Sequence, residues 1–257
     1  MKAKKIAGII VFLLCAAALP AAAKPGPVVL TFMERVESQS DAISSSATRD
    51  ASGETFLYSM ISAFRKLDND VTGNLYYLNK YSIDDGANAS HIWGLNIART
   101  LTNKWKVDLS FSHSSSPQRN TVPSSDSDRF SFGVTYKVNP LEKIRPRYTL
   151  KTTYSTGTDF SEGRTLSQKA SMADSLSKAW SYNLGYTFVW GLNENGTTLF
   201  KEHYTNQYQG DLTYKIDRKQ RVTIGVLYLQ QLYHSANAAN RSDSNMLTRV
   251  SYFYSYY

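Results

Sequence analysis

The feature that most constrains this chain is an alternation of apolar and polar residues with a period of two, which recurs along most of its length. The longest stripe consists of Trp180, Tyr182, Leu184, Tyr186, Phe188 and Trp190. Similar stripes occupy residues 105–111, 130–136, 148–154, 222–228 and 250–256. Successive side chains of a strand point to opposite faces, whereas a helix brings together residues three and four apart. The sequence therefore predicts an all-β fold.

The segments between the predicted strands alternate between two lengths. Short turns are expected near residues 67–70, 102–104, 139–143, 174–178 and 217–220. Longer polar loops are expected near residues 40–54, 83–90, 115–127, 157–164, 191–206 and 235–245. These connections imply about twelve strands, and short periplasmic turns with longer outer loops are the habit of membrane barrels. We expect a transmembrane antiparallel up-and-down β-barrel with both termini in the periplasm.

A soluble β-sandwich is the main alternative, because its strands also alternate. The outer faces of a sandwich are polar, however, and its loops are uneven in length. Here the apolar stripes are heavily aromatic and the opposite stripes carry charges on many strands. This pattern favours strands that separate lipid from a polar interior.

The first 23 residues have the order of features of a secretory signal peptide. Three lysines within the first five residues precede an apolar run from Ile6 to Leu19, and Ala21-Ala22-Ala23 supplies a small-residue cleavage site. The run is shorter than the roughly 20 residues of a membrane-spanning helix. We expect residues 1–23 to be cleaved and residues 24–257 to form a single barrel domain in the outer membrane.

Composition narrows the classes of function further. The only cysteine, Cys15, lies within the predicted signal peptide, so the mature chain is expected to have neither a disulfide nor thiol chemistry. The formal charge of +8 includes the three lysines of the signal peptide, so the mature chain is expected to carry only a mild positive excess. That charge does not require nucleic acid as a partner, and export argues against it. The 18 tyrosines and the mean hydropathy of −0.38 fit alternating lipid-facing and interior positions.

The C-terminal segment Ser251-Tyr-Phe-Tyr-Ser-Tyr-Tyr257 is strongly aromatic. With the signal segment and the alternating strands, it makes the chain resemble the porin-like outer-membrane β-barrels of Gram-negative bacteria. This resemblance implies contact with outer-membrane lipid and recognition of the last strand by the barrel assembly machinery. The aromatic stripe of Tyr252, Tyr254 and Tyr256 is one residue out of phase with Tyr257, and no motif assigns the chain to one barrel family.

Strand register can be predicted where the stripes are clean. Placing Lys137 opposite Arg145 also places Thr135 opposite Arg147, so polar residues face polar residues. In the last hairpin, Tyr214 is expected opposite Ile224. The stripes of the first, second, third and eighth strands are less clean, and their faces stay unassigned.

The polar phase of the clean strands is expected to line the interior of the barrel. It carries nine charged residues: Lys106, Asp108, Arg129, Lys137, Arg147, Lys151, Asp211, Lys215 and Arg249. Cations outnumber acids in this set, and a cationic interior concentrates anions. Such charges also serve merely to keep an interior hydrated or to pair with acids, and Lys137 and Lys215 are expected at the periplasmic mouth, where Lys and Arg cost little. The first hypothesis is therefore a channel or porin-like barrel for small polar solutes. The positive charge of the interior favours anionic solutes among them.

A second hypothesis is an enzyme. His113 and Ser115 lie two residues apart on one face, in the lipid-facing phase of Trp105 and Phe111, and Asp126 or Asp128 follows on the next strand. A His-x-Ser pair near the outer edge resembles the outer-membrane phospholipases and lipid A deacylases. The resemblance implies that His113 activates Ser115 and that Asp128 orients His113. The tract around Ser115 is rich in serine, so the pairing also arises easily by chance.

The remaining candidate ligands form no recognisable site. All four histidines, His91, His113, His203 and His234, fall near the predicted outer edge, where amphipathic rings are common. Neither the spacing of a zinc site nor a nucleotide-binding fingerprint accompanies them. We expect no metal and no cofactor. A third hypothesis is a structural or assembly barrel without transport.

Overall fold

The computed structural model describes residues 26–39, 43–44, 55–84, 86–117, 125–138, 147–157, 164–192, 200–235 and 241–256. The predicted signal peptide, Arg145 and Tyr257 lie outside these ranges. The described residues form thirteen strands in one antiparallel sheet. Their bounds are β1 (Val28–Gln39), β2 (Ile43–Ser44), β3 (Thr55–Lys66), β4 (Val71–Ser82), β5 (Ala87–Thr100), β6 (Trp105–Ser116), β7 (Ser125–Lys137), β8 (Arg147–Gly157), β9 (Arg164–Ser175), β10 (Trp180–Leu192), β11 (Phe200–Lys215), β12 (Gln220–Ser235) and β13 (Arg241–Tyr256).

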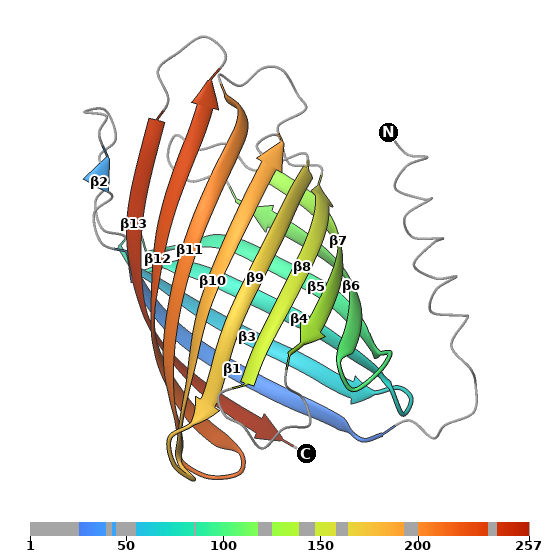
Figure 1. Cartoon of the computed structure of the whole chain (residues 1–257). Coiled ribbons are helices and arrows are strands. Elements are labelled where there is room, and N and C mark those ends of the chain that lie inside the picture. The colour runs from blue at the N-terminus through green and yellow to red at the C-terminus, as the bar shows by residue number, and fades with distance from the viewer. Residues whose placement is uncertain are drawn as a thin grey trace.

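The sheet closes on itself because β1 pairs with both β3 and β13. Figure 1 shows the long strands wrapping around a common axis, with β1 and β13 meeting at the seam. The two-residue strand β2 pairs with Asp243 and Ser244 of β13, beyond the last β1 pair between Gln39 and Leu247. The strand β2 therefore extends the pairing along β13 beyond the end of β1 and does not add a further strand to the barrel wall. The prediction of an antiparallel barrel with about twelve strands is confirmed.

Tight hairpins gather at one end of the barrel, which we call the turn end, and the opposite end is the loop end. Four hairpins share one backbone pattern, in which the N–H groups of Leu67, Leu101, Leu176 and Ile216 each bond to the carbonyl four residues later. The first residue of this pattern is leucine in three of the hairpins and isoleucine in the fourth. A side-chain oxygen caps the turn in the same way in three of them. These oxygens, on Thr102, Ser177 and Asp217, each accept from the N–H three residues on.

The outward face carries exposed apolar side chains on β1, β3 and β4, whose stripes were unclear, as well as on the strands with clean stripes. Phe32 and Val36 are exposed on β1, Ile61 on β3, and Leu75 and Tyr77 on β4. Aromatic rings pair across strands near the turn end, with centroids 4.7 Å apart for Trp105–Tyr136 and 4.8 Å apart for Trp180–Tyr214. Such rings are typical of a membrane–water interface. Among the described residues, no helix is long and apolar enough to cross a membrane.

Both predicted registers were wrong by an even number of residues. Thr135 pairs with Lys151 rather than Arg147, a shift of four, and Tyr214 pairs with Val222 rather than Ile224, a shift of two. An even shift keeps each side chain on its face, because the side-chain period of a strand is two. The predicted side chains therefore lie on the predicted faces of these strands, although the predicted strand partners were wrong. The hydrophobic pattern does not determine the type and length of the turns, and these set the register of a hairpin.

Candidate functional site in the barrel interior

Strand pairing puts the predicted interior residues on the inward phase, opposite the exposed apolar side chains. This set comprises Lys106, Asp108, Arg129, Lys137, Lys151, Asp211, Lys215 and Arg249. The backbone of Arg147 pairs with Ala173, but its side chain lies outside the described part of the structure. Four of these residues form two ion pairs, and Lys106, Lys137 and Lys215 form no ion pair with a carboxylate in the described ranges.

The first ion pair joins β6 to β8 across the intervening strand β7. Lys151 Nζ lies 2.8 Å from Asp108 Oδ1 and 3.0 Å from Oδ2. The link passes over Gly133, where a Cβ would lie 2.7 Å from the Asp108 carboxylate and 2.8 Å from Lys151 Cε. Both distances are too short for ordinary contact, so a glycine at this position lets the pair cross the strand.

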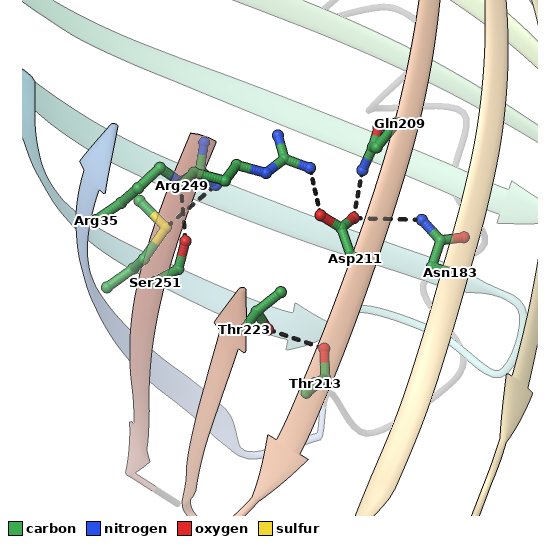
Figure 2. Close-up of polar contacts among 9 residues, drawn as sticks. Arg35, Asn183, Gln209, Asp211, Thr213, Thr223, Arg249 and Ser251 are labelled. Atoms are coloured by element: carbon green, nitrogen blue, oxygen red, sulfur yellow. Dashed lines mark hydrogen bonds and ion pairs between the residues drawn. The ribbon is translucent and has the colours of Figure 1, made fainter. Parts of the chain in front are cut away.

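The second ion pair repeats this arrangement between β11 and β13. Arg249 Nη2 lies 2.6 Å from Asp211 Oδ1, and the link passes over Gly225 of β12. The Asp211 carboxylate also accepts from Gln209, and Asn183 Nδ2 lies 3.5 Å from it, as Figure 2 shows. Asp211, Gly225 and Arg249 stand directly opposite one another in the strand register. The acid is therefore fixed by an arginine and two amides.

A neutral side chain makes a third crossing of the same kind. Tyr76 of β4, Gly94 of β5 and Ser112 of β6 are register partners. The Tyr76 ring lies over Gly94, where any Cβ would overlap it, and its hydroxyl forms a hydrogen bond with Ser112. Inward glycines thus serve three cross-strand contacts around the barrel wall.

Several inward cations form no ion pair with any carboxylate in the described ranges: Arg35, Lys106, Lys137, Lys169, Lys215 and Arg221. Lys169 pairs in register with Lys151, so two lysines face each other near mid-strand. Arg35 donates through Nε to Ser251 Oγ at 3.0 Å. The nearest inward acid to Arg35 along β1 is Glu37, which accepts a hydrogen bond of 3.0 Å from the Tyr58 hydroxyl. The interior therefore keeps an excess of positive charge.

Sequence reasoning missed Arg35, Glu37, Lys169 and Arg221. The first two lie on β1 and Lys169 lies on β9, two strands whose faces had been left open. On β9 the outward neighbours of Lys169 are Gln168 and Ala170, so no aromatic stripe marks the lipid side. Arg221 starts β12 with the parity of that strand's polar phase. It could have been found from the stripe of Val222, Ile224 and Val226.

A cavity of about 520 Å³ opens on the inward face of β1 and β10–β13 near the turn end. It is lined mainly by polar and charged side chains, among them Arg35, Asp211, Arg221 and Arg249. A pore wall with this lining can hold water and attract anions.

The His113 cluster lies on the outward face near the loop end. His113 Nδ1 lies 2.8 Å from Asp128 Oδ1, its register partner on β7, and Trp93 packs against the imidazole ring. Ser115 shares the outward phase of His113, and its own partners are His91 and Asp126. His91 instead accepts from or donates to Tyr77 Oη at 2.9 Å. No group of three metal-ligating side chains occurs among the described residues.

Comparisons with known proteins bear on the fold alone. An outer membrane channel from Pseudomonas putida F1 superposes with a TM-score of 0.60 and 11% sequence identity, covering 92% of this chain and 99% of that one. The KdgM porin gives 0.52 at 10% identity over 88% and 99% of the two chains. The NanC porin gives 0.52 at 10% identity over 86% and 98%.

No family model matches the sequence, and no curated protein matches it. The chain therefore has the fold of bacterial outer-membrane barrels, with an apolar outward face, and is similar in fold to these channels.

Proposed function

We propose that the barrel is a channel for small polar solutes with a preference for anions. The observation that carries the proposal is the group of inward cations that have no described carboxylate within ion-pair distance. Of these, Arg35 and Lys169 lie well inside their strands, and Arg221 lies closer to the turn end.

The ion pairs decide which charges act on a passing solute. In each of the pairs Asp108–Lys151 and Asp211–Arg249 the charges cancel at short range. Lys169 has no such partner, so its field reaches the interior. In a narrow aqueous pore with low-dielectric walls, a fixed positive charge raises the local concentration of anions and lowers their barrier to entry.

Barrel size is compatible with a pore. Barrels of about 8 strands are filled by side chains, and those of 16 or more enclose an open channel. A barrel whose wall has twelve strands lies between these limits. A porin of the same fold, KdgM, forms a complex with disordered oligogalacturonate, a polyanionic sugar chain. The porin in that complex matches this chain with a TM-score of 0.51 and 11% sequence identity. That complex supports an anionic class of solute for this barrel.

The direct test is conductance of the purified protein in planar lipid bilayers. Discrete, reproducible current steps are expected, whereas a heat-denatured sample of the same preparation is expected to give none. The folded state is verified beforehand by faster migration of the unboiled sample on a denaturing gel. A folded barrel that inserts without conducting would contradict the proposal.

A second function, hydrolysis of outer-membrane lipid, is favoured by the His113–Asp128 hydrogen bond. Asp128 holds Nδ1, which leaves Nε2 to take a proton from a serine hydroxyl, as in an acid–base–nucleophile relay. Ser115 is the candidate nucleophile because it lies on the same face, two residues towards the loop end.

The hydrolase proposal is tested by release of fatty acid from phospholipid or lipid A, with and without calcium. Wild type is expected to release fatty acid, and Ser115→Ala and His113→Ala are each expected to abolish release. Ser114→Ala is the matched control, since its side chain is in the inward phase. Absence of hydrolysis by wild type would exclude this second function.

A further inference from the structure

We infer that the cavity on β1 and β10–β13 is a binding subsite for a small carboxylate that also carries hydroxyl groups, such as a sugar acid. The inference rests on the proposed channel function for its physiological role, since a solute must reach the interior. Its binding test is independent of conduction.

The floor of the cavity is a row of hydroxyl groups in strand register. Ser181, Thr213, Thr223 and Ser251 are successive partners across β10, β11, β12 and β13. Thr213 Oγ1 and Thr223 Oγ1 lie 2.9 Å apart, and Figure 2 shows the hydrogen bond between them. Because these side chains are short, they leave space above them. Each hydroxyl can both donate and accept, which suits a solute with several hydroxyl groups.

Arginines surround this row on three sides. One register position towards the loop end lies Arg249, which is already bound to Asp211. Towards the turn end lies Arg221, whose guanidinium stacks on Phe253 with its carbon 4.5 Å from the ring centroid. At the β1 end of the row, Arg35 pairs in register with Ser251. The cavity thus has three guanidinium groups on its walls.

The charges in the cavity do not balance among the side chains that line it. Asp211 is the one acid among them, and it is occupied by Arg249. Arg221 keeps its N–H edges open, because stacking on Phe253 uses only the face of its guanidinium. A planar guanidinium edge binds a carboxylate through two parallel hydrogen bonds. A carboxylate would therefore supply the missing partner.

Size and chemistry together select the ligand class. A volume of about 520 Å³ accommodates a small solute. Neutral polyols would bind the hydroxyl row but leave Arg221 unpaired, and a simple inorganic anion would leave the row unused. A hydroxylated monocarboxylate satisfies both parts of the lining.

The inference is tested by isothermal titration of the full-length barrel in detergent with gluconate. Sorbitol is the comparison, because it has the same carbon chain with a hydroxymethyl group in place of the carboxylate. Gluconate is expected to bind and sorbitol is not. Arg221→Gln is expected to weaken gluconate binding by roughly tenfold to a hundredfold, the effect of losing a charged hydrogen bond. Arg99→Gln, which removes an exposed cation on the outward phase of the turn end, is expected to leave the affinity unchanged.

Three results would each overturn the subsite: no heat with gluconate, equal binding of sorbitol, or full affinity in a folded Arg221→Gln barrel. Planar-bilayer conductance separates this failure from that of the channel. A barrel that conducts but does not bind gluconate would lack the subsite and remain a channel. A barrel that binds gluconate through Arg221 but never conducts would retain the subsite and contradict the channel proposal.

Discussion

The two ion pairs of the interior have the same plan and different degrees of enclosure. Each joins an acid on one strand to a cation two strands away, over an inward glycine. In the Asp211–Arg249 pair the side chains are 12% and 14% exposed, whereas in the Asp108–Lys151 pair the acid is 8% and the lysine 36% exposed. Thus both charges of the first pair are withdrawn from water, and the second pair keeps its ammonium partly hydrated.

Register explains this difference. Asp211, Gly225 and Arg249 form one row, so a planar guanidinium reaches the acid directly and two amides complete the contacts. The partner of Gly133 on β8 is Thr153, and Lys151 lies two residues along the strand. Its longer, flexible side chain reaches Asp108 on a diagonal. The Asp211–Arg249 pair, whose residues lie in one register row, is therefore a fixed structural link. The Asp108–Lys151 pair, which runs diagonally across β7, is a looser one.

Removing the acid should therefore cost more at the first pair than at the second. Asp211→Asn leaves the Arg249 charge enclosed without a counter-charge and is expected to lower the free energy of unfolding by about 3 kcal/mol. Asp108→Asn is expected to lower it by about 1 kcal/mol or less, because water replaces the lost partner of Lys151. Urea unfolding in lipid vesicles, followed by the gel-mobility shift, measures both. Equal losses would mean that enclosure does not set the strength of these pairs.

The glycine crossings provide a second test of the row geometry. Gly225→Ala places a Cβ where the Asp211 carboxylate lies and is expected to lower the free energy of unfolding by about 1–3 kcal/mol. Since this substitution and Asp211→Asn remove the same link, their effects are expected to be clearly less than additive. Gly210→Ala is the matched control on β11, because its added Cβ meets only an ordinary contact of 3.6 Å with Leu184. Full additivity would separate Gly225 from the ion pair.

The smallest effect is expected at the exposed pair of the turn end, where Arg99 Nε lies 2.8 Å from Asp70 Oδ2. This hydrogen bond holds the pKa of Asp70 below its ordinary value of 3.8. A lowered folded-state pKa stabilises the protein above pH 3.8, and the contribution disappears as the pH falls through the folded pKa. Wild type should therefore lose slightly more stability than Asp70→Asn between pH 6 and pH 3. Parallel unfolding midpoints of the two proteins would remove any role for this pair.

The sequence predicted the barrel because its lipid-facing stripes are set by the period of two alone. Strand parity is insensitive to even shifts in register, so the inward phase of Lys137 and Lys215 was predictable although their strand partners were not. On β1 and β9 the stripe is interrupted by polar or small outward residues, such as Glu34 and Gln168. The interior charges of those strands were missed for that reason.

Contacts across two strands could not be predicted from the sequence. Asp108 and Lys151 were placed on the same face, but their pairing depends on register and on the space that Gly133 leaves. The pairing alters the expected role of Lys151, because an acid already offsets its charge. By contrast, the contact of His113 with Asp128 needed only that the two residues lie on neighbouring strands, and the sequence had offered Asp126 or Asp128 as the partner.

The most direct test of the account is the reversal potential of single channels under a potassium chloride gradient. The account predicts an anion-selective wild type. Lys169→Gln should reduce that selectivity more than the double substitution of Asp108→Asn with Lys151→Gln, because Lys169 has no described acid partner, whereas the Asp108–Lys151 pair carries no net charge. A cation-selective wild type, or folded variants whose reversal potentials all equal that of wild type, would contradict the claim that unpaired interior cations set the preference for anions.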